Sequence, residues 1–217
     1  MKRESANRIS PDDEVIAVLE RYSCPVPFHE VRTRFLGCIA SPIQPAPTSA
    51  IDAMKDLWGG EFPALPSIEA LNELIGALVN DLWNRLTYHQ DHDKQFRLTR
   101  VDVLPTMEGL GQLTQVRRQE LDGFMIGLLG NAEHIDLPPR AHQAVEELAE
   151  MRSIIEGARM LTADPTKTGT TVEIADTIDN IGKLPQIAET EIHEAVVACA
   201  SARAQLMSMP AAVQTKQ

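Results

Sequence analysis

The most regular feature of the sequence is an apolar stripe at helical spacing that begins just after Ser67. Isoleucine and leucine recur every three or four positions over about five helical turns, at Ile68, Leu71, Leu74, Ile75, Leu78, Leu82 and Leu86. Ser67 is a favourable N-cap residue, and the polar run 89–94 ends the pattern. A helix with one apolar face needs other elements to cover that face, so the stripe predicts a helical fold with a shared core.

Helix signals recur along the rest of the chain. Ser10 and Pro11 precede acidic residues, as in a first helical turn, and Thr170 and Glu173 have the spacing of a capping box. The only candidate strand, 100–103, is too short to build a sheet. We therefore predict an all-α fold: a single irregular bundle of about seven to eight helices in two subdomain-like halves, without a sheet. Long helices are expected over 28–40, 67–88, 116–129, 138–161 and 185–207, with shorter ones before residue 24, before Trp58 and after Thr170.

The chain is predicted to form one domain, 1–217, because 217 residues fit a domain of ordinary size. Residues 95–115 contain a proline and two glycines that break helices, so we expect irregular structure and a subdomain boundary there. The last residues, 208–217, are expected to be a frayed tail.

The charge and composition of the chain indicate which classes of molecule it can bind. The chain has 31 acidic and 20 basic residues, a formal net charge of −11. Such a field repels nucleic acid and anionic membranes and attracts a basic protein. No apolar run of about 18 residues is present, so we expect no membrane-spanning helix. The three cysteines form no CxxC motif, which favours reduced thiols and a cytoplasmic location.

One cluster could hold a metal ion. His89 and His92 are three positions apart, so on a helix they would share a face, and Asp93 is adjacent. The sequence around them has no HExxH motif and no matching Cys/His set. A solvated helix end, where histidines are favoured by the helix dipole, explains the cluster better than a metal site does.

Two stretches, 31–42 and 121–130, share an arrangement in which an apolar residue precedes a phenylalanine and small residues surround it. Phe35 and Phe124 are expected to pack inward, while glycine or alanine lets a neighbouring helix approach. Glycine inside a helix is unfavourable by up to about 1 kcal/mol, so it needs a packing or functional reason. We predict that Gly123 lies at a close helix crossing, where alanine and, more strongly, valine would destabilise the fold.

Packing motifs spread over about residues 12–203 occur in the order found in a known bacterial family. A phenylalanine helix, a proline-containing turn and a Trp-Gly-Gly segment come first, at Phe35, Leu36, Pro42, Leu57, Trp58, Gly59 and Gly60. A long helix with an asparagine near its end follows at 78–84, then a Gly-Phe helix at 121–127 and an Ile-x-x-Ala-Val pattern at 192–196. The chain resembles the YecA/YgfB-like family. This resemblance implies an all-helical fold, a cytosolic setting and no established enzymatic activity.

Two functions follow as hypotheses. The first is a non-enzymatic protein, without catalytic residues or a cofactor, that binds another protein. Its candidate interaction or packing residues lie on and near the two phenylalanine helices: Phe35, Trp58, Gly59, Gly60, Asp122, Gly123 and Phe124. The alternative is a metal- or small-molecule-binding enzyme that uses the histidine cluster. The sequence leaves open which protein is bound and whether the chain forms homo-oligomers.

Overall fold

The computed structural model describes residues 10–42, 49–130, 135–164, 166 and 169–208. Of these residues, 75% are helical and none is in a strand, so the predicted all-α class is confirmed for this part of the chain. The expected frayed tail lies, apart from Ser208, outside the described residues. No helix within the described ranges is long and apolar enough to cross a membrane.

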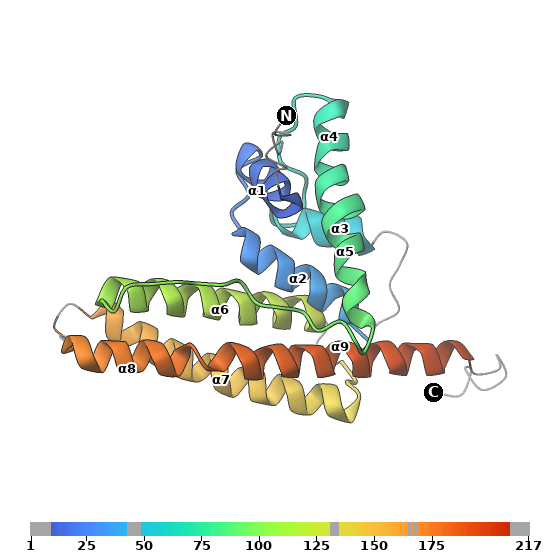
Figure 1. Cartoon of the computed structure of the whole chain (residues 1–217). Coiled ribbons are helices and arrows are strands. Elements are labelled where there is room, and N and C mark those ends of the chain that lie inside the picture. Colours follow the sequence, from blue (N-terminus) through green and yellow to red (C-terminus); the bar gives the residue numbers. More distant parts are fainter. Residues whose placement is uncertain (1–9, 43–48, 131–134, 165, 167–168, 209–217) are drawn as a thin grey trace, which may run out of the picture.

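The N-terminal half stands as an upright group of helices in Figure 1. It contains α1 (Pro11–Arg21), α2 (Phe28–Ala40), α3 (Ser49–Asp56), α4 (Ile68–Ile75) and α5 (Asn84–Thr87). The capping signal read from the sequence is confirmed, because the Ser10 hydroxyl accepts from the backbone and Asp13 completes a capping box. The second helix has the bounds that the sequence predicted.

The predicted apolar stripe forms one long rod rather than a uniform α-helix. A π-helical segment, η1 (Gly76–Trp83), joins α4 to α5, and a short 3-10 turn, η2 (Tyr88–Gln90), ends the rod. Most of the stripe turns inward, and its buried members are Leu74, Leu78, Leu82 and Leu86. The first member, Ile68, is 69% exposed, because the rod begins beyond the helices that cover it.

The C-terminal half is a layer of long helices. Figure 1 shows α6 (Met107–Leu129), α7 (Pro139–Ala163) and α9 (Leu184–Ser208) side by side, with α8 (Thr171–Ile181) before α9. The expected start of the first of these helices, at Val116, is wrong. Helix α6 begins nine residues earlier, because the Thr106 hydroxyl caps it by accepting from the Gly109 amide at 3.0 Å. Glycine at this position avoids overlap with the Leu104 carbonyl, so it permits a sharp entry into the helix.

Helices α2 and α6 join the two halves at a very close crossing. A Cβ built on Gly123 would lie 2.6 Å from Thr33 Oγ1 and 2.7 Å from the Glu30 carbonyl oxygen. One turn further, a Cβ on Gly127 would overlap the Arg34 carbonyl, and one on Gly37 would overlap the opposite backbone. The predicted close crossing at Gly123 is therefore present, and the glycine lies in the second half of α6.

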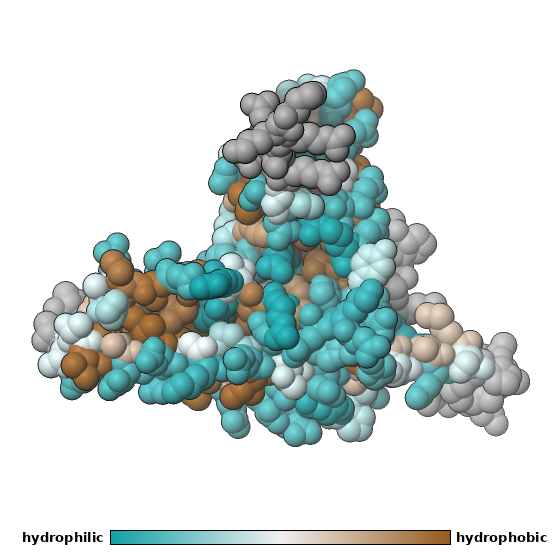
Figure 2. Space-filling model, viewed as in Figure 1, coloured by the Kyte–Doolittle hydropathy of each residue, from teal (hydrophilic) through white to brown (hydrophobic). Residues whose placement is uncertain are grey.

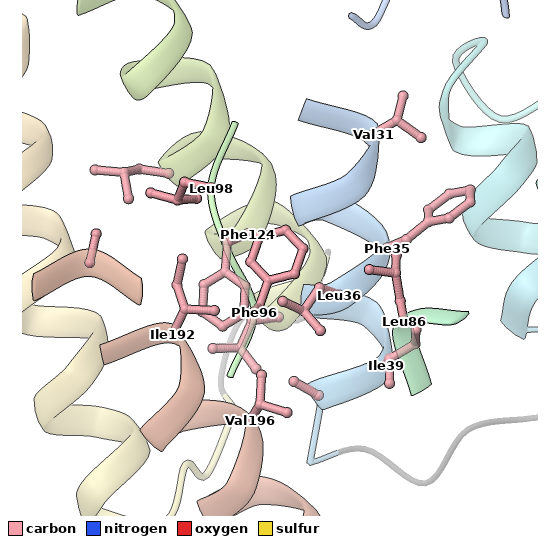
Figure 3. Close-up of a cluster of buried hydrophobic side chains, with 14 of the residues drawn as sticks. Val31, Phe35, Leu36, Ile39, Leu86, Phe96, Leu98, Phe124, Ile192 and Val196 are labelled. Atoms are coloured by element: carbon pink, nitrogen blue, oxygen red, sulfur yellow. The ribbon is translucent and has the colours of Figure 1, made fainter. Parts of the chain in front are cut away.

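One buried core continues across this crossing. Figure 3 shows Phe35 and Leu86 on one side and Phe124 with Ile192 on the other. Arg203 of α9 ties the two halves further, because its buried guanidinium donates to the Ile39 carbonyl at 2.9 Å and also to the Ser41 carbonyl. These carbonyls end α2, so the arginine satisfies acceptors that the helix leaves free.

Candidate functional site

A segment that is neither helix nor strand connects the N-terminal half to the start of α6. We call residues 94–106 the strap; it runs from η2 along α6 to the start of that helix (Figure 1). Two glutamates hold its backbone: the Leu98 amide donates to Glu189 Oε1 at 2.9 Å, and the Thr99 amide donates to Glu120 Oε1 at 2.7 Å. Two successive amides of the strap are thus held by different helices, that of Leu98 by α9 and that of Thr99 by α6.

Both carboxylates that hold the strap are nearly inaccessible to water. Glu120 is 0% exposed and Glu189 is 7% exposed. Each also accepts from an arginine at 2.5 Å, Glu120 from Arg117 and Glu189 from Arg97. Buried carboxylates need such partners to remain charged, so the strap, the arginines and the glutamates form one mutually dependent network.

The strap is also held from α2. The Arg32 guanidinium lies 4.9 Å from the centroid of the Phe96 ring and donates to the Arg97 carbonyl at 3.2 Å. Burial lowers the pKa of Arg32, although Asp12 and Glu120 oppose that effect. Cation–π and hydrogen-bond contacts from Arg32 therefore fix the first half of the strap. The Phe96 ring of the strap packs in the core (Figure 3).

Beside the strap lies an open groove of about 740 Å³. The strap forms one wall, and α8, the turn 182–183 and the start of α9 form the other. Its apolar lining comes from the strap, α6 and α8: Leu98, Val101, Val103, Leu113 and Ile178. Figure 2 shows hydrophobic residues gathered at the end of the molecule that these elements share.

The charged side chains at the rim of the groove largely neutralise one another. Arg100 Nε lies 3.0 Å from Asp102 Oδ2, and Arg97 is paired with Glu189. Across the groove, Lys183 donates to Asn180 Oδ1 at 3.2 Å. The groove therefore combines an apolar floor with a polar rim of little net charge, although the whole chain is strongly acidic.

Part of the strap has backbone groups without a hydrogen-bond partner among the described residues. Within the part of the chain that the structure describes, the amides and carbonyls of 100–103 have no hydrogen-bond partner. The same residues line the groove, so their unpaired backbone groups lie beside it.

The structure separates the interaction residues that the sequence suggested. Phe35, Gly123 and Phe124 are buried in and around the crossing of α2 and α6, so they are packing residues and offer no surface to a partner. Asp122 is bound to Arg152 of α7 in an ion pair. The suggested surface between the two phenylalanine helices is therefore occupied by the core of the protein itself.

The Trp-Gly-Gly segment follows α3 and lies in the N-terminal half. Trp58 is half-buried and its indole nitrogen donates to the Tyr22 carbonyl at 3.1 Å. Gly59 and Gly60 have φ of 83° and 102°, and a Cβ on either would meet no neighbour. The turn requires glycine because its backbone is in the left-handed region, which other residues rarely adopt. Close contact with a neighbouring residue is not the reason.

The histidine cluster is engaged in structural contacts. His89 Nδ1 donates to the Lys94 carbonyl at 2.7 Å, and burial lowers the pKa of this imidazole. The neighbouring His92 carbonyl accepts from His193 Nε2 at 3.0 Å, while Asp93 is exposed. Among the described residues, no group of three or more His, Cys, Asp or Glu side chains could hold a metal ion.

The cysteines are free thiols. Cys199 is fully buried, and burial raises its pKa and that of Cys38 to about 11. Cys24 is half-buried, and burial raises its pKa as well. Thiols with raised pKa values are poor nucleophiles near neutral pH, so none of the three is arranged as a reactive cysteine.

The sequence predicted neither the groove nor the two glutamates that hold the strap. Residues 100–103, the candidate strand, are assigned to no strand and have no backbone hydrogen bond to other described residues. Glu120 and Glu189 escaped notice because an isolated glutamate on a helix is normally solvated. The only local signal was the spacing of Arg117 and Glu120, which places both side chains on one helix face.

Comparison of the chain with protein-family models, curated proteins and solved structures found no match.

Proposed function

We propose that this protein is non-enzymatic and acts by binding another protein in the groove beside the strap. The observation that carries the proposal is the combination of an open apolar groove of about 740 Å³ with an adjoining backbone edge that has no partner among the described residues. An apolar floor inside a polar rim is the usual composition of a protein-binding surface. The rigid network around the strap supports this role, because a fixed surface loses little entropy on binding.

Membership of the YecA/YgfB-like family and a cytoplasmic setting belong to the same proposal. They rest on the packing motifs around Phe35, Trp58 and Phe124 and on the unpaired cysteines. The close crossing at Gly123 supports the packing interpretation of these motifs.

Filling the groove should abolish partner binding. Gln186 is exposed on α9 and lines the groove, so Gln186→Trp places a large ring in it without disturbing the core. Gln205→Trp is the matched control, since it makes the same change at an exposed position elsewhere on α9. In a pull-down from native lysate at physiological salt, the wild type and Gln205→Trp should retain the same protein, and Gln186→Trp should lose it.

Equal capture by both tryptophan variants would show that the partner binds elsewhere and would contradict the proposed site. Capture of nothing but free protein by all three chains would contradict the proposed function itself.

A basic partner is favoured by the net charge of −11. Its association rate constant should fall by about tenfold when ionic strength rises from about 0.03 M to about 0.5 M, because salt screens long-range attraction. The dissociation rate constant should change much less, since the apolar contacts in the groove are not screened. Surface plasmon resonance with the captured partner measures both constants, and a salt-independent association rate would exclude a basic partner.

A further inference from the structure

We propose that the segment bound in the groove is uncharged and apolar and places one asparagine or glutamine side chain against Arg117. This inference rests on the proposed function, and it adds the chemistry of the bound segment. It starts from a buried hydrogen-bond donor that the fold leaves without an acceptor.

Arg117 of α6 lines the groove, although the residue is only 7% exposed. Among the described residues its guanidinium has one hydrogen-bond partner, Glu120, which accepts from Nη1 at 2.5 Å. The Nε atom is buried and makes no hydrogen bond to any of them. A buried donor without an acceptor is unfavourable, so an oxygen atom supplied by a bound molecule would stabilise this arginine.

A trapped water molecule is a poor acceptor for this donor. A second cavity against Arg117 has a volume of about 10 Å³, which is close to the least that one water molecule needs. Every other residue that lines this cavity is apolar. A buried water is held by about two to four polar partners, so the groove is the side from which an acceptor can come.

The charges around Arg117 are already balanced, which favours a neutral acceptor. Glu120 offsets Arg117, and Arg97 offsets Glu189 at 2.5 Å. Both carboxylates are nearly inaccessible to water. A further carboxylate at this place would be a buried charge without a counter-ion, and a lysine side chain has no acceptor to offer.

The rest of the groove favours an uncharged apolar segment. Arg100 and Asp102 neutralise each other at 3.0 Å, and Asp179 and Lys183 carry opposite charges on the other wall. Aliphatic side chains of a partner can pack on the apolar lining described above. The bound segment is therefore uncharged, even where the rest of the partner is basic.

A carboxamide is the neutral side chain that suits this site best. Its oxygen stands further from the main chain than a backbone carbonyl or a serine hydroxyl does, so it can reach a donor that lies among buried residues. Its nitrogen offers two donors. The carbonyls of 100–103 can accept from them, because they have no partner in the part of the chain that the structure describes.

Selection from a display library of random short peptides on the intact chain identifies the segment. The enriched peptides should carry aliphatic residues around a recurring asparagine or glutamine, without an acidic residue in the motif. Replacing that carboxamide residue with leucine should weaken binding to the wild type by about tenfold or more, because a hydrogen bond to a charged group is lost. Fluorescence anisotropy measures these affinities.

Arg117→Lys removes the Nε donor and keeps a positive charge beside Glu120. It should weaken binding of the carboxamide peptide by a similar factor. The leucine peptide should bind Arg117→Lys and the wild type alike, because the contact is then already absent. Arg100→Lys is the matched control, since it makes the same change in an exposed arginine at the rim, and it should keep the affinity of the wild type.

If Arg117→Lys does not fold, as judged by circular dichroism, NMR spectroscopy of the wild type replaces it. The signal of the Arg117 Nε–H group should shift when the carboxamide peptide binds and should stay in place with the leucine peptide.

Two kinds of result separate this contact from the proposed function. Peptides that lose binding to Gln186→Trp but need an acidic residue, lack a carboxamide, or leave the Arg117 signal and the affinity for Arg117→Lys unchanged would overturn the contact and leave the proposed function standing. Peptides that bind Gln186→Trp with full affinity, or a library that yields no enriched peptide, would overturn both proposals.

Discussion

Replacing Glu120 with alanine should destabilise the fold by about 3–5 kcal/mol, because it leaves a buried arginine without its counter-ion. The Glu120 carboxylate is 0% exposed and accepts from both the Arg117 guanidinium and the Thr99 amide. Alanine removes both acceptor oxygens, so a buried charge and a strap amide lose their partners together. Glu120→Gln should destabilise less, since its amide oxygen can still accept from the strap.

Urea denaturation followed by circular dichroism measures this loss as a lower midpoint. Asp102→Ala is the control, because it breaks an exposed ion pair in the same strap, and such pairs contribute at most about 1 kcal/mol. Equal midpoints for the wild type and Glu120→Ala would mean that the carboxylate does not hold the strap.

The second large effect is expected at the crossing of α2 and α6. A Cβ on Gly127 would overlap the Arg34 carbonyl and lie 2.9 Å from the Cys38 amide nitrogen. Both neighbours are backbone atoms, which cannot move aside as a side chain can. Gly127→Ala should therefore destabilise by about 1–3 kcal/mol through overpacking, and Gly127→Val by more. Gly123→Ala and Gly123→Val should follow the same order, because Thr33 and Glu30 are similarly close.

Gly157 supplies the matched control for these glycines. It lies at an exposed position inside α7, and a Cβ there meets no atom within 4 Å. Alanine at this site should stabilise the protein by up to about 1 kcal/mol from helix propensity alone. Thermal or urea melts of the variants decide the question, and a raised midpoint for Gly127→Ala would show that the helices do not meet closely there.

Local chemistry explains why so much of the helical fold was predictable. Several signals act within a few residues, so a single sequence is enough to predict them. They are the capping boxes at Ser10 and Thr170, prolines at the starts of helices, and the helical spacing of apolar residues. The close crossing at Gly123 could also be predicted, because glycine is unfavourable inside a helix and its presence there implies a packing reason. The early start of α6 was missed because Gly109 interrupts the helical pattern while serving the entry turn.

The groove could not be predicted, because it depends on contacts between distant residues. Leu98 meets Glu189 and Thr99 meets Glu120 only after α6 and α9 have both packed on α7. A glutamate becomes buried through that packing, so the residues next to it in the sequence do not predict its burial. The motifs that stood out most, around Phe35 and Phe124, proved to be core, so the prominence of a motif here reflected packing rather than binding.

Hydrogen exchange on the chain alone and on the chain with its captured partner shows whether the partner occupies the groove beside the strap. We expect the bound partner to slow amide exchange along the groove, in 97–103 and 178–189. At single-residue resolution, the amides of 100–103 should gain the most protection, since they have no hydrogen-bond partner among the described residues. Protection confined to other surfaces, such as the exposed apolar side chains Ile154 and Leu161 of α7, with unchanged exchange in the strap, would contradict it.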